Sequence, residues 1–110
     1  MSHHFLDVGG SISLGDSVTL AGRDTQIWSH TMKMQDGKQV LVPVAVHVGN
    51  MAYVGAKVIV VCSDLPAWCL VGAGAVVVKS FPDNGEVQVI AGNPATVKRT
   101  YPKTIAGSDE

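Results

Sequence analysis

Aliphatic residues return at a six-residue interval through the middle of the chain, and a small residue often follows them, as in Val48-Gly49, Val54-Gly55 and Val71-Gly72. A six-residue period matches neither the two-residue alternation of a single strand nor the 3.6-residue period of an α-helix. It is typical of short strands joined by tight corners, in which the aliphatic side chain points inward and the small residue eases the turn. The expected inward positions, with one five-residue step before Leu65, are Val42, Val48, Val54, Val60, Leu65, Val71 and Val77.

The same interval begins near the start of the chain and is interrupted once. The pairs Val8-Gly9, Leu14-Gly15 and Leu20-Ala21 predict most of a first coil, after which GRDTQIWSHT shifts the register by about one residue. Residues 31–41 lack the period and predict a loop that leaves the column between Trp28 and Val42. The chain is therefore predicted to be a single domain, 1–110, with repeats over 8–78, a protruding loop at 31–41, and a C-terminal turn and tail at 79–110.

Size and composition agree with a narrow column and exclude several functions. Hydrophobic residues make up 46% of the 110 residues but aromatic residues only 5%, as expected for an interior of stacked Val, Leu and Ile. A net charge of -1 without a basic run gives nucleic acid no binding surface. No apolar run approaches the ~20 residues that cross a bilayer, and MSHHFLDVGG lacks the features of a secretion signal, so we expect no membrane partner and a cytoplasmic protein. Cys62 and Cys69 are expected to stay reduced, as small buried or corner thiols.

The repeats and the segment that follows them resemble the hexapeptide-repeat acyltransferases, especially the galactoside, maltose and serine acetyltransferase group. After the last repeat, VVVKSFPDNGEVQVIAGNPATVKR is similar to the family's ending, in which a Val-rich strand, a Lys, a Pro-led loop, an Ala-Gly-Asn-Pro-Ala turn and a basic residue follow in order. The resemblance covers about residues 8–99. It implies an all-β fold, a left-handed parallel β-helix with one extruded loop, and transfer of an acyl group from coenzyme A.

The resemblance also implies a catalytic base at His30, in QIWSHT, where the family carries the His that takes a proton from the acceptor's hydroxyl or amine. An imidazole suits this role because its unperturbed pKa of about 6.5 leaves much of it neutral near pH 7. An exposed loop histidine without a catalytic role is the alternative. Asp24 and Ser29 are candidates to orient the ring, and Trp28 is as easily a plug of the core as a lid over the site.

The residues that would bind acetyl-CoA are also implied by the resemblance. Many relatives have Trp at the position of Tyr53, beside the acetyl end of the cofactor, and a Thr where this chain has Val78. The family binds the pantetheine arm through small corner residues, although hexapeptide corners need small residues in any case. The cofactor-binding residues expected from these matches are Tyr53, Ala56, Ala73, Lys79 and Arg99, with the last two holding phosphate.

Two other functions share this fold class. The γ-class carbonic anhydrases bind zinc with three His across a subunit boundary, but nothing around His47 repeats their five-residue ligand spacing, and His3 and His4 lie outside the repeats. We therefore expect no metal. The second alternative is a non-catalytic trimeric scaffold or assembly subunit.

The expected function is transfer of an acyl group, with acetyl as the expected group, to a hydroxyl or amine of a small molecule such as a sugar, an antibiotic or an amino acid derivative. The resemblance implies that the 31–41 excursion reaches toward a neighbouring subunit. A column of about three coils in 110 residues has flat walls and little core, so we expect a homotrimer with sites in the clefts between subunits.

Overall fold

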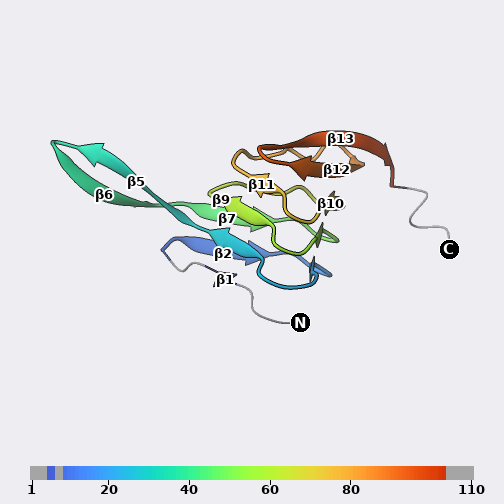
Figure 1. Cartoon of the computed structure of the whole chain (residues 1–110). Coiled ribbons are helices and arrows are strands. Elements are labelled where there is room, and N and C mark those ends of the chain that lie inside the picture. The colour runs from blue at the N-terminus through green and yellow to red at the C-terminus, as the bar shows by residue number, and fades with distance from the viewer. Residues whose placement is uncertain (1–4, 7–8, 104–110) are drawn as a thin grey trace.

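A computed structural model describes residues 5–6 and 9–103, and all the regular structure among them is β-strand (Figure 1). Apart from two antiparallel hairpins, the paired strands are parallel and form three walls around a common core. The chain passes through walls 1, 2 and 3 in turn and then enters the next coil. This arrangement confirms the parallel β-helix that the six-residue pattern predicts. Wall 1 consists of β2 (Ser11–Leu14) and β7 (Ala45–Val48), wall 2 of β3 (Thr19–Leu20), β8 (Tyr53–Val54), β10 (Cys69–Val71) and β12 (Glu86–Gly92), and wall 3 of β1 (Phe5–Leu6), β4 (Gln26–Trp28), β9 (Ile59–Val61) and β11 (Val76–Val77).

The length of a coil follows from the strand register. Val54 pairs with Val71 in wall 2, and Val60 pairs with Val77 in wall 3, so each of these coils takes 17 residues. Three six-residue units would take 18, and the missing residue is the five-residue step before Leu65. That step is therefore confirmed by the register.

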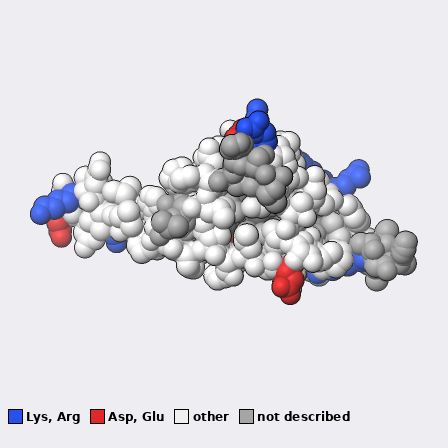
Figure 2. Space-filling model, turned by 90° about the horizontal axis from the view of Figure 1, so that it is seen from below, with Lys and Arg blue, Asp and Glu red and all other residues white. Residues whose placement is uncertain are grey.

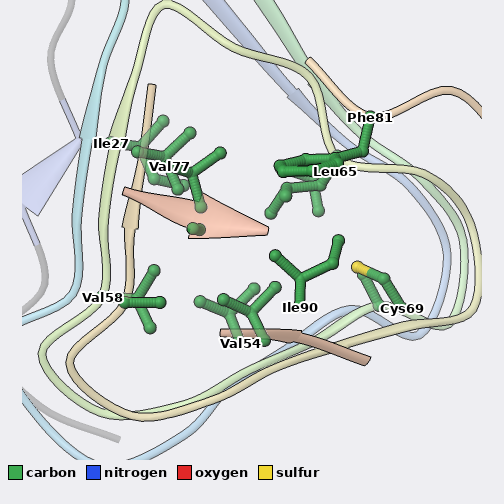
Figure 3. Close-up of a cluster of buried hydrophobic side chains, with 14 of the residues drawn as sticks. Ile27, Val54, Val58, Leu65, Cys69, Val77, Phe81 and Ile90 are labelled. Atoms are coloured by element: carbon green, nitrogen blue, oxygen red, sulfur yellow. The ribbon is translucent and has the colours of Figure 1, made fainter. Parts of the chain in front are cut away.

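The predicted inward positions from Val48 onward form the core, and none of them is more than 3% exposed. A second inward position lies two residues before most of them, because alternate residues of a strand point to the same side. Figure 3 shows side chains of both sets pointing toward one another inside the coils. This second set, which the six-residue interval alone did not single out, consists of Val46, Ala52, Val58, Cys69 and Ala75.

Small residues at the corners let successive coils approach one another. The backbone N–H of Gly49 donates to the carbonyl of Leu65 in the next coil at 3.0 Å, and that of Gly55 donates to Val71 at 2.9 Å. A Cβ added at Gly49 would lie 2.3 Å from the backbone nitrogen of Ala67. Glycine is thus required at this corner by the closeness of the neighbouring backbone.

The excursion predicted as a loop over 31–41 is a β-hairpin, formed by β5 (His30–Gln35) and β6 (Lys38–Pro43). Asp36 and Gly37 both have positive φ, 53° and 76°, as a two-residue type I′ turn requires. The hairpin projects away from the column (Figure 1). Because Val42 belongs to β6 and is only half-buried, its prediction as an inward residue of the column is wrong, and the repeats resume in β7.

The two ends of the column differ. At the C-terminal end, β12 folds back on β13 (Ala95–Pro102), so the strands expected at 87–90 and 96–99 form one antiparallel hairpin. The expected turn before it is present, since the N–H of Gly85 donates to the Asp83 carboxylate at 2.8 Å. At the N-terminal end, Leu14 remains 41% exposed although its wall partner Val48 is buried. Val8 and the tail at 104–110 lie outside the described residues.

Within the part of the chain that the structure describes, no helix is long and apolar enough to cross a membrane.

Candidate active site

His30 is the first residue of the hairpin, at the corner where wall 3 ends and the chain returns toward wall 1. The imidazole is half-buried and meets the Trp28 ring edge-on, with 5.9 Å between the ring centroids. On its other side lies Gly9, where an added Cβ would be 2.6 Å from Nδ1 of His30. The ring is therefore held between β4 and the segment that leads into β2.

The neighbours of His30 are themselves fixed. Trp28 packs against Phe5 with 4.8 Å between ring centroids, and its Nε1 donates to Oε1 of Gln26 at 3.1 Å. Ser29 is fully buried, and its Oγ accepts a 3.0 Å hydrogen bond from the N–H of Gly10. Trp28 thus lies on the outside of the column against the candidate base, rather than as a plug within the core.

Tyr53 and Arg99, expected at opposite ends of the cofactor, lie on the same face of wall 2. The register runs from Tyr53 to Leu70, from Leu70 to Val89 and from Val89 to Arg99. Their neighbours Val54, Val71 and Ile90 point into the core, so this row points outward. With about 4.8 Å between strands, the row places Tyr53 about 14 Å from Arg99 along the wall.

Ala56 and Ala73 lie in adjacent coils at the corner between wall 2 and wall 3. The N–H of Gly74 donates to the Ala56 carbonyl at 2.9 Å, and an added Cβ at Gly55 would be 2.8 Å from the backbone nitrogen of Ala73. The two alanines therefore adjoin the Tyr53 face, as a binding surface for one extended ligand would require.

Lys79 and His30 lie at a different corner. Lys79 follows β11 at the junction of walls 3 and 1, two coils beyond His30, and its Nζ lies 5.6 Å from the centroid of the Phe81 ring. In a three-walled column this corner is opposite wall 2. One chain therefore brings Tyr53, Arg99 and the two alanines together and keeps His30 and Lys79 away from them.

A second imidazole, missed as a candidate base, has a carboxylate partner. His47 points outward from wall 1, with Nδ1 3.5 Å from Oδ1 of Asp64, and the same oxygen accepts the backbone N–H of His47 at 2.8 Å. Asp64 is held in turn by its own N–H, which donates to Oγ of Ser80 at 2.8 Å. The signal in the sequence is the 17-residue spacing of His47 and Asp64, which is one coil.

The remaining metal-ligating residue types are dispersed. Among residues 5–6 and 9–103, no group of three or more His, Cys, Asp or Glu side chains is arranged to hold a metal ion. Cys62 and Cys69 are free thiols, the first at a corner and the second fully buried. Burial raises the pKa of the Cys69 thiol from 9.0 to about 12, because the interior disfavours the thiolate.

No family model and no curated protein matches the sequence. Solved structures do match. A hexapeptide-repeat-containing acetyltransferase from Vibrio cholerae has a TM-score of 0.75 at 20% identity, over 89% of this chain and 56% of that one. An N-acyltransferase from Bacillus cereus, in complex with dTDP-4-amino-4,6-dideoxyglucose and coenzyme A, has 0.71 at 16% identity, over 87% and 55%. A galactoside acetyltransferase in complex with coenzyme A has 0.69 at 20%, over 84% and 46%.

The chain thus spans about half the length of these structures. The likeness extends over nearly all of the coils described above, and identities of 13–20% make it a likeness of fold. The column that the six-residue pattern predicts is the β-helix of the hexapeptide-repeat acetyltransferases.

Proposed function

We propose that the protein is a CoA-dependent acyltransferase that moves an acetyl group to a hydroxyl or amine of a small molecule such as a sugar, an antibiotic or an amino acid derivative. The observation that carries the proposal is His30, held half-buried against Trp28 where a hairpin interrupts the repeats. Structural neighbours with this fold contain coenzyme A, and one also contains an amino sugar nucleotide.

His30 acts as the general base in this proposal. The acceptor oxygen or nitrogen attacks the thioester carbonyl carbon while the imidazole takes the acceptor's proton. Backbone N–H groups stabilise the oxyanion that forms, an effect worth about 3 kcal/mol per donor in other enzymes. When the C–S bond breaks, the imidazolium returns the proton to the CoA sulfur. The products are an ester or amide and free coenzyme A.

Wall 2 and its corner with wall 3 bind the donor in this proposal. Tyr53 lies beside the acetyl end, Ala56 and Ala73 allow the pantetheine arm close to the backbone, and Arg99 binds phosphate through its two-pronged guanidinium. The order of these residues along wall 2 and its corner supports an extended ligand. Lys79, at the opposite corner, provides a point charge for a phosphate bound by a neighbouring subunit.

The outer surfaces of the walls support a trimer with a site shared between subunits. Wall 3 presents mainly apolar side chains outward, wall 2 presents Tyr53 and Leu70, and wall 1 presents Ser11, Ser13 and His47. A cyclic trimer needs two different complementary surfaces on each subunit. Packing wall 3 against wall 2 of the next subunit covers both, and it places the corner with His30 beside the neighbour's Tyr53 and Arg99. The outward apolar residues of wall 3 are Trp28, Ile59, Val61, Val76 and Val78.

The hairpin extends the same contact. Its face shared with His30 carries Met32, Met34 and Leu41, all about half exposed or more. Figure 2 shows charges of both signs at the end of the molecule where the hairpin protrudes, and only scattered charged side chains elsewhere on that face. In the proposed trimer the hairpin covers the donor site of the next subunit.

Calorimetry with acetyl-CoA tests the donor site. We expect binding that weakens several-fold in Arg99→Ala, because a phosphate contact is lost. The absence of heat at millimolar acetyl-CoA would favour the scaffold function instead.

Release of free thiol with a panel of acceptors tests the base. His30→Ala is expected to lower the rate at least a hundred-fold, whereas His47→Ala, which removes the other described imidazole, should leave most of it. Full activity in His30→Ala together with loss in His47→Ala would assign the reaction to the His47–Asp64 pair.

A further inference from the structure

The ring of His30 is confined by two residues from different coils. Trp28 meets it edge-on at 5.9 Å, and Gly9 leaves no room for a side chain, since its added Cβ would lie within 2.8 Å of three atoms of His30. Gly9 does not adopt positive φ, so backbone conformation is no reason for glycine at this position. The reason is the imidazole that occupies the space of a side chain.

Further contacts fix both sides of this arrangement. Phe5 stacks on the opposite side of Trp28 at 4.8 Å, and the Trp28 Nε1 hydrogen bond to Gln26 limits rotation of the indole. On the other side, Gly10 is attached to buried Ser29 through a 3.0 Å hydrogen bond. Trp28 and Gly9 are therefore each held to the column independently of His30.

We propose that Gly9 and Trp28 are positioning residues that fix the orientation of the His30 imidazole for proton transfer. This inference rests on the proposed acyltransferase function. Neither residue supplies a proton or touches the donor. Because transfer of a proton requires a heavy-atom approach of about 2.6–3.2 Å, a ring free to rotate would spend less time in the productive orientation.

The first test changes Gly9 to Ala in the full chain. The added methyl group must displace the imidazole, so we expect kcat to fall about ten- to a hundred-fold, while the dissociation constant of acetyl-CoA stays within two-fold. Ser11→Ala, an exposed change on β2 close to Gly9, is the matched control and should alter neither value.

The second test observes the ring without relying on activity. The indole of Trp28 shifts the NMR signals of the His30 ring protons, which are identified by their loss in His30→Gln. We expect Gly9→Ala and Trp28→Leu to move these signals, and Ser11→Ala to leave them in place. Trp28→Phe keeps an aromatic ring and should retain more of kcat than Trp28→Leu, although both lose the hydrogen bond to Gln26.

The outcomes separate the inference from the function on which it rests. Unchanged His30 signals in folded Gly9→Ala protein would overturn the inference, as would moved signals with an unchanged kcat. If the wild-type protein transfers no acyl group to any acceptor, the proposed function fails and the positioning role with it. In that case the NMR signals still show whether Gly9 and Trp28 confine the ring.

Discussion

Mixing two inactive variants tests whether the active site is shared between chains. His30 lies at the corner opposite wall 2, and Arg99 lies on the outer face of that wall. A site that uses both must therefore take them from different subunits. The variants are His30→Ala, which removes the base, and Arg99→Glu, which reverses the charge offered to the cofactor phosphate.

The expected activity follows from counting interfaces. In trimers assembled at random from equal amounts of the two variants, about one quarter of the interfaces join an intact His30 to an intact Arg99 of the next chain. If the site lay within one chain, no site would be intact. The shared site therefore predicts about one quarter of wild-type activity and the single-chain site predicts none.

The assay is thiol release at an acetyl-CoA concentration below the wild-type KM, after the two variants are unfolded together and refolded. Native mass spectrometry of differently tagged protomers must first show mixed trimers, and refolded wild-type protein gives the reference rate. Mixed trimers without activity above that of the separate variants would refute the placement of His30 and Arg99 in one shared site.

Three further predictions follow from the column itself. Gly49→Ala should lower the free energy of unfolding by about 3 kcal/mol, since moving the coils apart weakens bonds such as Gly49 to Leu65, whereas Gly74→Ala, with φ of 78° and no contact, should lower it by about 1 kcal/mol. Urea unfolding at one protomer concentration compares them. Iodoacetamide at pH 8 should modify Cys62 and spare buried Cys69. The raised pKa of Cys69 adds stability that is complete below pH 9.0 and is lost as pH rises toward 12, as unfolding at several pH values will measure.

The column was predictable because its core repeats one simple requirement. Each coil needs a few inward aliphatic side chains, and the positions from Val48 to Val77 in the six-residue frame meet that requirement. Even the irregular step before Leu65 could be located, since a missing residue shifts every later member of the frame. The hairpin was missed because its strands carry no such frame, although Asp36-Gly37 between two extended runs is a recognised turn signal.

The site was less predictable because the sequence does not show which wall or corner a residue occupies. Tyr53 and Arg99 share a face only because four strands intervene in a particular order, one of them antiparallel. The partner of His47 was within reach, since a 17-residue coil places Asp64 directly after it in the stack. The contact of Gly9 with His30 was not, because it depends on how the chain closes the first coil.

A hairpin is the kind of insertion that such a column accepts without losing its register. His30 and Pro43 face each other at the base of the hairpin, so the chain returns to the corner that it left. The separation of the paired Ile27 and Val60 is therefore 33 residues instead of 17, yet both point into the same core. Because the first residue of the insertion is fixed to the column while the rest projects, the hairpin provides a rigid place for His30 and an exposed surface beside it. The interruption of the repeat is thus where a base can be added without disturbing the fold.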